Sequence, residues 1–308
     1  MTETDSSTTE GEQPLPKVLP AVALMVFATL CAAVMAAMIR GLATELHPVE
    51  IAFFRNLVGV LMLSPLLLRG GMAVLKTGRP GLHVIRAAST LVAMLTLYTA
   101  LSLAPLALVT ALNFTAPLFT ALLAIVLLGE KVGRARIIAL LVGFAGTVII
   151  LRPGIETITF GAVLVLISSL AWASTLTAIK ELGRDESSLT ITAIGLLLVT
   201  PLSLIPALFF WQTPTWSQAG WLVGIGVVGT LGQWAIAQAF RQADATAVLP
   251  LDFLRLVWAS ALGLLIFHEW PSLWTWIGAG VIVASTTYLG LRENRRQVAQ
   301  NTTVVSGS

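Results

Sequence analysis

The stretch LNFTAPLFTALLAIVLLGEK at residues 112–131 returns in altered form as LDFLRLVWASALGLLIFHEW at residues 251–270. In both stretches a Leu-polar-Phe triplet precedes an apolar run that leads to a glutamate. A second apolar run follows each, so that residues 105–153 and 244–293 read as two copies of one unit. A duplicated block of hydrophobic helices is typical of secondary transporters, whose substrate site lies between the two halves.

The composition places the chain in a membrane. Apolar residues make up 56% of it, charged residues make up only 11%, and the mean hydropathy is +0.89. A soluble domain carries roughly 25% charged residues, so this chain cannot form a surface that faces water on all sides. The net charge of +3 does not indicate nucleic acid as a partner, because the basic residues stand singly between apolar runs. The expected surroundings are the lipid bilayer.

The apolar runs predict the number of transmembrane helices. A spanning helix needs about 20 mostly apolar residues. Runs of about this length are separated by short loops and lie near residues 18–39, 49–68, 82–103, 106–128, 134–151, 160–180, 189–210, 219–240, 246–267 and 272–291. The expected fold class is therefore an all-α polytopic membrane protein with ten transmembrane helices.

Basic residues predict the orientation, because lysine and arginine accumulate in cytoplasmic loops. With ten spans, both termini lie on one side of the membrane. If that side is the cytoplasm, the cytoplasmic segments hold fourteen basic residues and the outer loops hold two, Arg40 and Arg152. Indole rings favour the headgroup region, and five tryptophans fall at outer ends of spans: Trp211, Trp216, Trp221, Trp270 and Trp274. We expect a bacterial-type cytoplasmic (inner) membrane with both termini cytoplasmic.

The alignment extends upstream, since Gly59…Pro65 matches Gly195…Pro201, so the ten spans form two repeats of five. Five is an odd number, so the second repeat must enter the membrane in the opposite sense. We therefore expect two inverted five-helix repeats, which can exchange conformations to open inward and outward. The expected domains are a disordered cytoplasmic tail at 1–17, a first repeat at 18–156, a second, inverted repeat at 157–292 and a cytoplasmic tail at 293–308.

Several short motifs give this architecture a family resemblance. They are Phe54-Arg55-Asn56, Ala116-Pro117, Gly129-Glu130-Lys131 and Trp172, together with the two five-helix units themselves. On these grounds the chain resembles the EamA-type drug/metabolite transporters over about residues 18–292. The resemblance implies a ten-helix bundle around a central cavity that carries small metabolites by alternating access. Helices 1 and 6 lack the acidic residue of the small multidrug-resistance relatives, which leaves coupling to protons or to a counter-substrate open.

Two charged residues at membrane depth are the first candidates for substrate binding. Asp252 and Arg255 are spaced i and i+3, which places them on one helix face. Ionisable groups inside a span are costly unless they face a wet cavity or a partner. The pair either binds a zwitterionic or anionic substrate or locks the helix to a neighbour. Asn113 aligns with Asp252, and the adjacent Phe114 and Phe253 are equivalent in the same way, so all three join the candidate site.

The remaining candidates for the cavity wall are polar or aromatic residues inside other spans: Arg55, Gln233, Trp172 and Tyr98. Arg55 has an alternative role, because it lies close enough to the outer face to snorkel or to bridge to Glu45 or Glu50. Proline also interrupts two of the spans, at Pro117 and Pro250, where the loss of a backbone donor favours a bend.

The sequence gives no sign of an enzyme. The three histidines, His47, His83 and His268, lie at span ends without the spacing of a metal site, and Cys31 is the only cysteine. We therefore expect no catalytic residue, no metal and no cofactor. The prediction is a secondary transporter for a small polar or zwitterionic metabolite, such as an amino acid, an organic anion or a vitamin-like compound. A channel or facilitator pore is the alternative, and a membrane-embedded enzyme is third.

Overall fold

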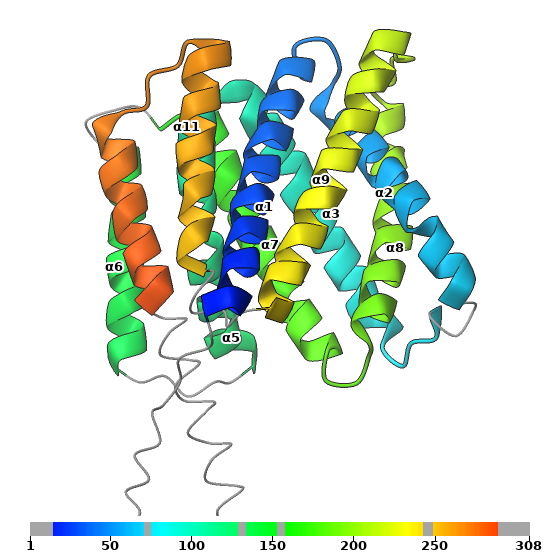
Figure 1. Cartoon of the computed structure of the whole chain (residues 1–308), viewed down its shortest axis with the longest axis horizontal. Coiled ribbons are helices and arrows are strands. Elements are labelled where there is room, and N and C mark those ends of the chain that lie inside the picture. The colour runs from blue at the N-terminus through cyan, green and yellow to red at the C-terminus, as the bar shows by residue number, and fades with distance from the viewer. Residues whose placement is uncertain (1–14, 71–74, 129–133, 153–157, 243–248, 289–308) are drawn as a thin grey trace, which may run out of the picture.

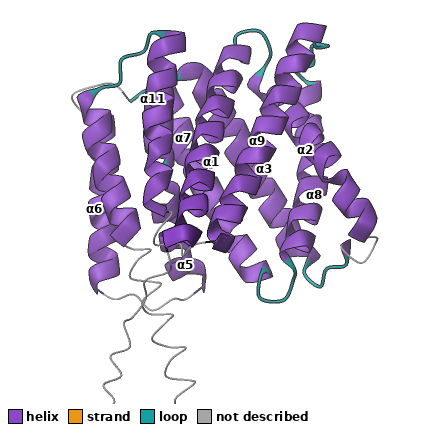
Figure 2. Cartoon of the chain, viewed as in Figure 1, coloured by secondary structure: helices purple, strands orange, loops and turns teal. Residues whose placement is uncertain are grey.

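The computed structural model describes residues 15–70, 75–128, 134–152, 158–242 and 249–288. The expectation of an all-helical protein is confirmed for these residues, in which no strand occurs (Figure 2). The expected tails fall mostly outside them. The first helix begins at Leu15, inside the segment expected to be a tail.

The helices follow the predicted spans closely (Figure 1). The first half contains α1 (Leu15–Leu42), α2 (Pro48–Gly70), α3 (Pro80–Leu103), α4 (Leu106–Asn113), α5 (Ala116–Leu128) and α6 (Arg134–Leu151). The second half contains α7 (Phe160–Leu182), α8 (Ser188–Leu208), α9 (Trp216–Gln242), the 3-10 helix η2 (Leu249–Phe253), α11 (Leu254–Phe267) and a last helix at residues 273–288.

Seven of the described segments are long and apolar enough to cross a membrane, and α4 and α5 together form one of them, Leu106–Leu127. The apolar part of α6, Ile137–Leu151, is shorter. Large apolar side chains cover the outside of the bundle, among them Phe209 at 80% and Leu265 at 74% exposure. A water-soluble monomer rarely exposes so much continuous apolar surface, which agrees with a multi-pass membrane protein.

Local chemistry explains where several helices begin. The Thr159 hydroxyl accepts a hydrogen bond from the Ala162 amide at 3.3 Å and caps α7. The Ser187 hydroxyl accepts one from the Thr190 amide at 3.1 Å and caps α8. The first amides of a helix have no partner within it, so such caps stabilise its start. Pro80 begins α3, where a missing amide hydrogen costs nothing.

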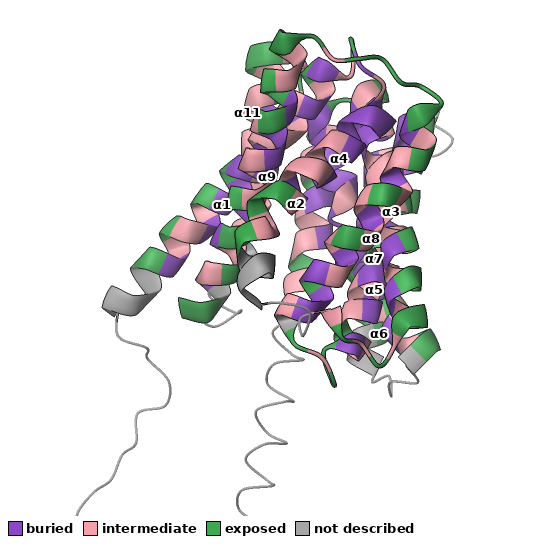
Figure 3. Ribbon diagram, turned by 90° about the vertical axis from the view of Figure 1, so that its right-hand side faces the viewer, coloured by how far each residue is buried: buried purple, intermediate pink, exposed green. Residues whose placement is uncertain are grey.

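The most extensive helix contacts join the two halves of the chain. Helix α3 packs along α7, α1 packs along α9, and α2 packs against α8. Figure 3 shows the α1–α9 pair diverging from the α3–α7 pair toward the end that carries the start of α1. The fold therefore brings together helices that belong to different halves of the sequence.

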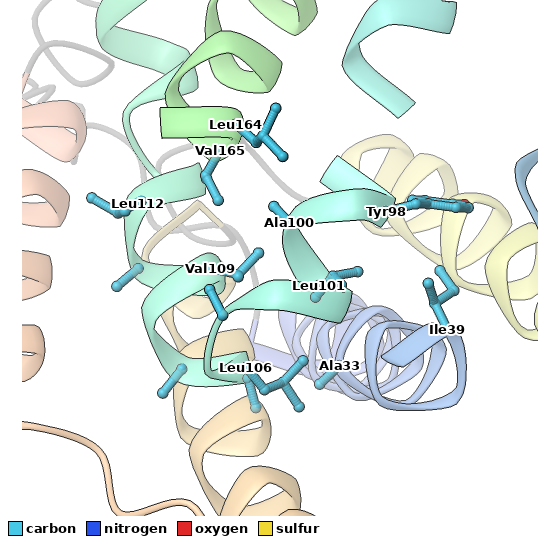
Figure 4. Packing of buried hydrophobic residues seen from close by; sticks show 14 of the residues in the cluster. Ala33, Ile39, Tyr98, Ala100, Leu101, Leu106, Val109, Leu112, Leu164 and Val165 are labelled. Carbon is cyan, nitrogen blue, oxygen red and sulfur yellow. The ribbon is translucent and has the colours of Figure 1, made fainter. Parts of the chain in front are cut away.

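The main hydrophobic core lies toward the opposite end, near the turn between α1 and α2. Its α1 members, from Ala33 to Leu42, all belong to the last third of that helix. They pack with Leu101 of α3 and with Leu106 and Val109 of α4 (Figure 4). Among the residues whose burial is described, a small cluster of Ala21 and Met25 with Ala239 lies at the other end of α1. The part of α1 that joins the main core is thus the end where α1 meets α2.

Candidate substrate site

The fourth apolar span is broken at its centre. Helix α4 ends at Asn113, and α5 begins at Ala116. Pro117 has no amide hydrogen and cannot donate to the carbonyl of Asn113 four residues earlier. The backbone turns there instead, and the Thr115 hydroxyl donates to the Leu112 carbonyl at 2.7 Å. This break places Asn113 and Phe114 at a helix end inside the bundle.

The ninth apolar span is broken at the equivalent place. Residues Leu249–Phe253 form the 3-10 helix η2, which contains Pro250, and the α-helix starts only at Leu254. Asp252 lies in η2, and Arg255 lies in the first turn of α11. Each copy of the repeated stretch therefore has its polar residue next to a proline-associated break.

The structure brings the two breaks into contact. The rings of Phe114 and Phe253 lie 5.9 Å apart, centroid to centroid. The Arg255 guanidinium carbon lies 4.9 Å from the centre of the Phe114 ring, a cation–π distance. The Arg255 Nη2 atom lies 3.6 Å from Asp252 Oδ2. Four of the predicted site residues thus form one cluster, which we call the break cluster: Phe114, Asp252, Phe253 and Arg255.

The charges of the break cluster are only loosely paired. A separation of 3.6 Å gives Coulomb attraction but is too long for a hydrogen bond. The Asp252 side chain is 36% exposed and the Arg255 side chain is 26% exposed. The buried Nε atom of Arg255 has no hydrogen-bond partner among the described residues. A guanidinium with an unused donor over an aromatic ring can bind an anionic or polar group and stack against a planar one.

Arg55 lies apart from this cluster, on the α2 face that meets α9. Its Nη1 atom lies 3.4 Å from Asn56 Oδ1. A Cβ atom at Gly229 of α9 would lie 3.6 Å from Arg55 Nε, an ordinary contact distance, so the guanidinium lies against α9.

The alternative expectation for Arg55, a bridge to Glu45 or Glu50, is wrong. Glu45 Oε2 accepts from Gln218 Nε2 at 2.9 Å, and Glu50 Oε2 accepts from the Gln212 amide at 3.3 Å. Both carboxylates therefore have partners at the start of α9 and in the turn before it.

The other candidates occupy three different environments. Tyr98 is 3% exposed and belongs to the main core. Trp172 of α7 is 37% exposed and Gln233 of α9 is also exposed. Asn113 is half-buried beside Phe114. The sequence therefore identified the residues of the break cluster together with others that do not contact it directly.

An ion pair that the sequence did not predict joins four segments near the α1–α2 turn. The Arg40 guanidinium of α1 donates to Glu269 Oε1, which follows α11. It also donates to the carbonyl oxygens of Leu101, at 3.0 Å, and Ala104 at the end of α3. Glu269 Oε2 in turn accepts from the Leu106 amide of α4 at 3.0 Å. We call this arrangement the Arg40–Glu269 latch.

The end of α11 is shaped to direct Glu269 into the latch. His268 adopts a left-handed backbone conformation, with φ 55°, and the Glu269 amide donates back to the Gly263 carbonyl at 3.0 Å. This is the bond pattern of a helix C-terminal turn that reverses the chain. From the sequence, Arg40 counted only as an outer basic residue. The sequence does contain a signal for the latch. Arg40 aligns with Lys180 and Glu269 aligns with Glu130, so each repeat carries a cation and a carboxylate at equivalent positions.

A second ionic cluster ties helices together at the opposite end of the bundle. Arg79, just before α3, bridges to Glu181 at 3.1 Å and to Asp185 at 2.6 Å. His83 Nε2 lies 2.7 Å from Glu186 Oε2, and the Thr77 hydroxyl donates to Glu186 Oε1. Burial alone would raise the pKa of the Glu186 carboxyl, but its hydrogen bonds to Thr77 and His83 outweigh burial and lower it. The start of α3 is thus held to the α7–α8 turn.

The chain is similar in sequence to characterised transporters. It is 31% identical to an S-adenosylmethionine uptake transporter of Rickettsia bellii, over 84% of this chain and 89% of the relative. It is 32% identical to a riboflavin transporter of Brucella anthropi, over 81% and 90%. It is 30% identical to the pseudopaline exporter CntI of Pseudomonas aeruginosa, over 86% and 93%. A relative named as an uptake transporter and one named as an exporter therefore both match most of its length.

The fold and the family agree with these similarities. A protein crystal structure matches 92% of this chain and 99% of its own chain with a TM-score of 0.55 and 20% identity, which shows a shared fold. The EamA-like transporter family matches residues 19–152 and again residues 159–291. The family thus matches the chain twice, once in each half. This chain therefore belongs to the EamA-like transporter family and is a membrane transporter.

Proposed function

We propose that the protein is a secondary transporter that carries a small polar metabolite by alternating access and binds it at the break cluster. The observation that supports this most directly is the contact between the two broken spans, where Phe114 and Phe253 meet beside a loosely paired Arg255. Broken helices at the interface of two repeats are the usual substrate sites of secondary transporters. The remaining candidates, Asn113, Arg55, Gln233, Trp172 and Tyr98, would line the path around it.

The chemistry of the cluster favours a substrate with a planar, nitrogen-rich ring or a zwitterionic group. Aromatic rings and a guanidinium stack well against such planar systems. S-adenosylmethionine and riboflavin, which name two of the relatives, both contain such a ring. S-adenosylmethionine also carries an amino-acid group that would match the Asp252 and Arg255 charges. We therefore place heteroaromatic metabolites first among the substrates, ahead of simple amino acids and organic anions.

The helix contacts support two inverted five-helix repeats with ten spans. Exchanging the copies turns α1 into α7 and α3 into α9, so the α3–α7 contact becomes the α9–α1 contact. These are the two most extensive pairings in the bundle. The α2–α8 contact maps onto itself, as expected for helices on a two-fold axis. Two similar halves of this kind can alternate between inward-open and outward-open forms.

In this description the structure represents the form that is closed near the α1–α2 turn. The main core and the Arg40–Glu269 latch both lie at that end. The orientation predicted by the basic residues would make it the outer end, with both termini in the cytoplasm. The protein would then be an inward-facing transporter of the inner membrane, and opening outward would require the latch to break.

Solute counterflow tests the transport mechanism. Purified protein in liposomes preloaded with riboflavin or S-adenosylmethionine should accelerate the entry of the same labelled compound, and the entry should saturate. A carrier exchanges substrate through its bound form, whereas a pore gives flux without trans-stimulation. Saturable trans-stimulated entry with either compound supports the proposal. Unsaturable flux without trans-stimulation supports the channel instead.

Labelling of two equivalent loops tests the inverted topology. Lys76 precedes α3 and Thr213 precedes α9, and both are exposed in the structure. With Cys31 replaced by serine, a cysteine at 213 should react in intact cells with a membrane-impermeant maleimide, and one at 76 should react only after permeabilisation. That result would place the two equivalent loops on opposite sides of the membrane, and it would support inverted repeats with cytoplasmic termini. Labelling of both cysteines in intact cells would contradict the inversion, and labelling of 76 alone would reverse the orientation.

A further inference from the structure

An apolar groove runs along the outside of α1, near the end that carries the α1–α2 turn. It has a volume of about 470 Å³. Helix α1 lies between α9 and α11 (Figure 1), and all three contribute to the groove. Its lining consists of Val34, Ala37, Met38, Gly41, Leu42, Glu45, Ser217, Trp221, Leu262, Ile266 and Phe267. It is separate from the break cluster, because none of its lining residues belongs to that cluster.

The length of the groove matches one leaflet of a bilayer. The lining begins at Val34 and continues on one face of α1 to Leu42, a rise of about 12 Å at 1.5 Å per residue. Glu45 lies about one turn farther, beyond the helix end. The total is close to half of a hydrocarbon core that is about 30 Å thick. The groove's mouth is the end where Glu45 and Ser217 lie. From Val34 to that mouth, every lining residue is apolar or glycine. The acyl tail of a lipid requires such a lining.

The mouth of the groove has the chemistry of a headgroup site. Glu45 and Ser217 are exposed there, and Gln218 orients the Glu45 carboxylate through a 2.9 Å hydrogen bond. Trp221 is 51% exposed on the facing helix, and indole rings favour the interfacial region of a bilayer. A carboxylate at this level attracts an ammonium group and repels an anionic headgroup.

We infer that this groove binds one acyl chain of a phospholipid that carries a primary ammonium headgroup, such as phosphatidylethanolamine. The tail lies along α1 between α9 and α11, and the ammonium group meets the Glu45 carboxylate. The bound lipid covers the seam between the first and second halves of the chain. The inference does not depend on the transported substrate or on the direction of transport.

Gly41 allows the groove to be filled without disturbing the helix. A Cβ atom at Gly41 would meet nothing within 4 Å, and the same is true of Gly220 on α9. Gly41 lines the groove, whereas Gly220 does not. Leucine favours the helical state over glycine, so Gly41→Leu should fold and project its side chain into the space of the tail. Gly220→Leu is the matched control.

Native mass spectrometry of the purified protein tests the inference. The full chain is equilibrated in detergent with equal amounts of phosphatidylethanolamine and phosphatidylglycerol of the same acyl composition. Wild type and Gly220→Leu should retain one phosphatidylethanolamine in preference, and Gly41→Leu should retain it at least about tenfold less. Glu45→Gln should keep a bound lipid but lose the headgroup preference. Ile266→Trp, which fills the groove from α11, should repeat the effect of Gly41→Leu if that variant is poorly folded.

Three results would overturn the inference. The first is equal retention of phosphatidylethanolamine by Gly41→Leu, Ile266→Trp and Gly220→Leu. The second is a wild-type protein that retains both lipids equally or prefers phosphatidylglycerol. The third is a dimer that Gly41→Leu dissociates, because the occupant would then be a second copy of the chain. A failed transport assay would change none of these readouts, so this inference and the proposed function can fail separately.

Discussion

Arg255→Ala should lower substrate uptake by at least about thirtyfold while the protein still folds. The guanidinium lies against Phe114 and near Asp252, with a buried nitrogen that has no partner among the described residues. Truncating one member of a charged contact with a ligand costs about 2–5 kcal/mol, and 2 kcal/mol corresponds to about thirtyfold. Uptake into liposomes, with the melting temperature measured in detergent, gives both quantities.

Comparison with further variants separates substrate binding from a structural role. Arg241→Ala removes an exposed arginine at the end of α9 and should leave uptake unchanged. If the pair serves only stability, Arg255→Ala and Asp252→Asn should each lower the melting temperature more than the double variant does, since a lone charge in a low-dielectric site is the costly state. If the pair binds substrate, the double variant should recover no uptake. Normal uptake by both folded single variants would exclude Arg255 and Asp252 from the substrate site.

Glu269→Gln should open the end of the bundle near the α1–α2 turn. It removes the carboxylate that joins α1 to α4 and the end of α11, and it leaves the Arg40 charge without its counter-ion. Breaking a fully buried pair costs about 3–5 kcal/mol. Because the two side chains are 17% and 20% exposed, we expect about 2 kcal/mol, or about thirtyfold in the ratio of open to closed protein.

Accessibility measures this opening directly. A cysteine in place of Asn113, with Cys31 replaced by serine, lies beyond the latch and should react slowly with an impermeant maleimide added from the latch side. The reaction should accelerate when Glu269→Gln is added. Glu181→Gln is the matched control, because that partly exposed carboxylate pairs with Arg79 at the opposite end. An unchanged labelling rate in folded Glu269→Gln protein would show that the latch is a structural ion pair and does not control the opening of this end.

Charge reversal provides a stricter test of the latch geometry. In the double variant Arg40→Glu and Glu269→Arg the two opposite charges are retained. A carboxylate at position 40 cannot donate hydrogen bonds to the carbonyl oxygens of Leu101 and Ala104, which the Arg40 guanidinium does. The reversed pair should therefore fail to restore slow labelling. Full restoration would show that charge alone closes this end.

Much of the helical framework could be predicted from the sequence, because its causes are local. Each span is an apolar run whose length is set by the thickness of a bilayer. The breaks near Pro117 and Pro250 follow from the missing amide hydrogen of proline. The pairing of Asp252 with Arg255 follows from helical spacing over three residues. Each of these properties depends on residues within about one helical turn or one span.

Contacts across the bundle could not be predicted in this way. Arg40 and Glu269 are 229 positions apart, and no periodicity along the chain specifies that they meet. The expectation that Arg55 bridges to Glu45 or Glu50 failed for the same reason. Those carboxylates lie near Arg55 in sequence, but packing of α9 and of the turn before it gave them Gln218 and Gln212 as partners. Tyr98 likewise became a core residue because helices from distant parts of the chain pack into the main core to which it belongs.

The sequence by itself determined that the chain is a duplicated set of apolar helices in which proline interrupts the fourth and the ninth span. The length of an apolar run and the effect of proline on the backbone depend on neighbouring residues, so both can be recognised in the sequence. Only the tertiary structure decided that the two breaks meet at Phe114 and Phe253, and that Arg40 and Glu269 hold one end of the bundle together. Those contacts depend on how helices distant in the chain pack side by side, and packing is set by the shapes of all the surfaces that meet.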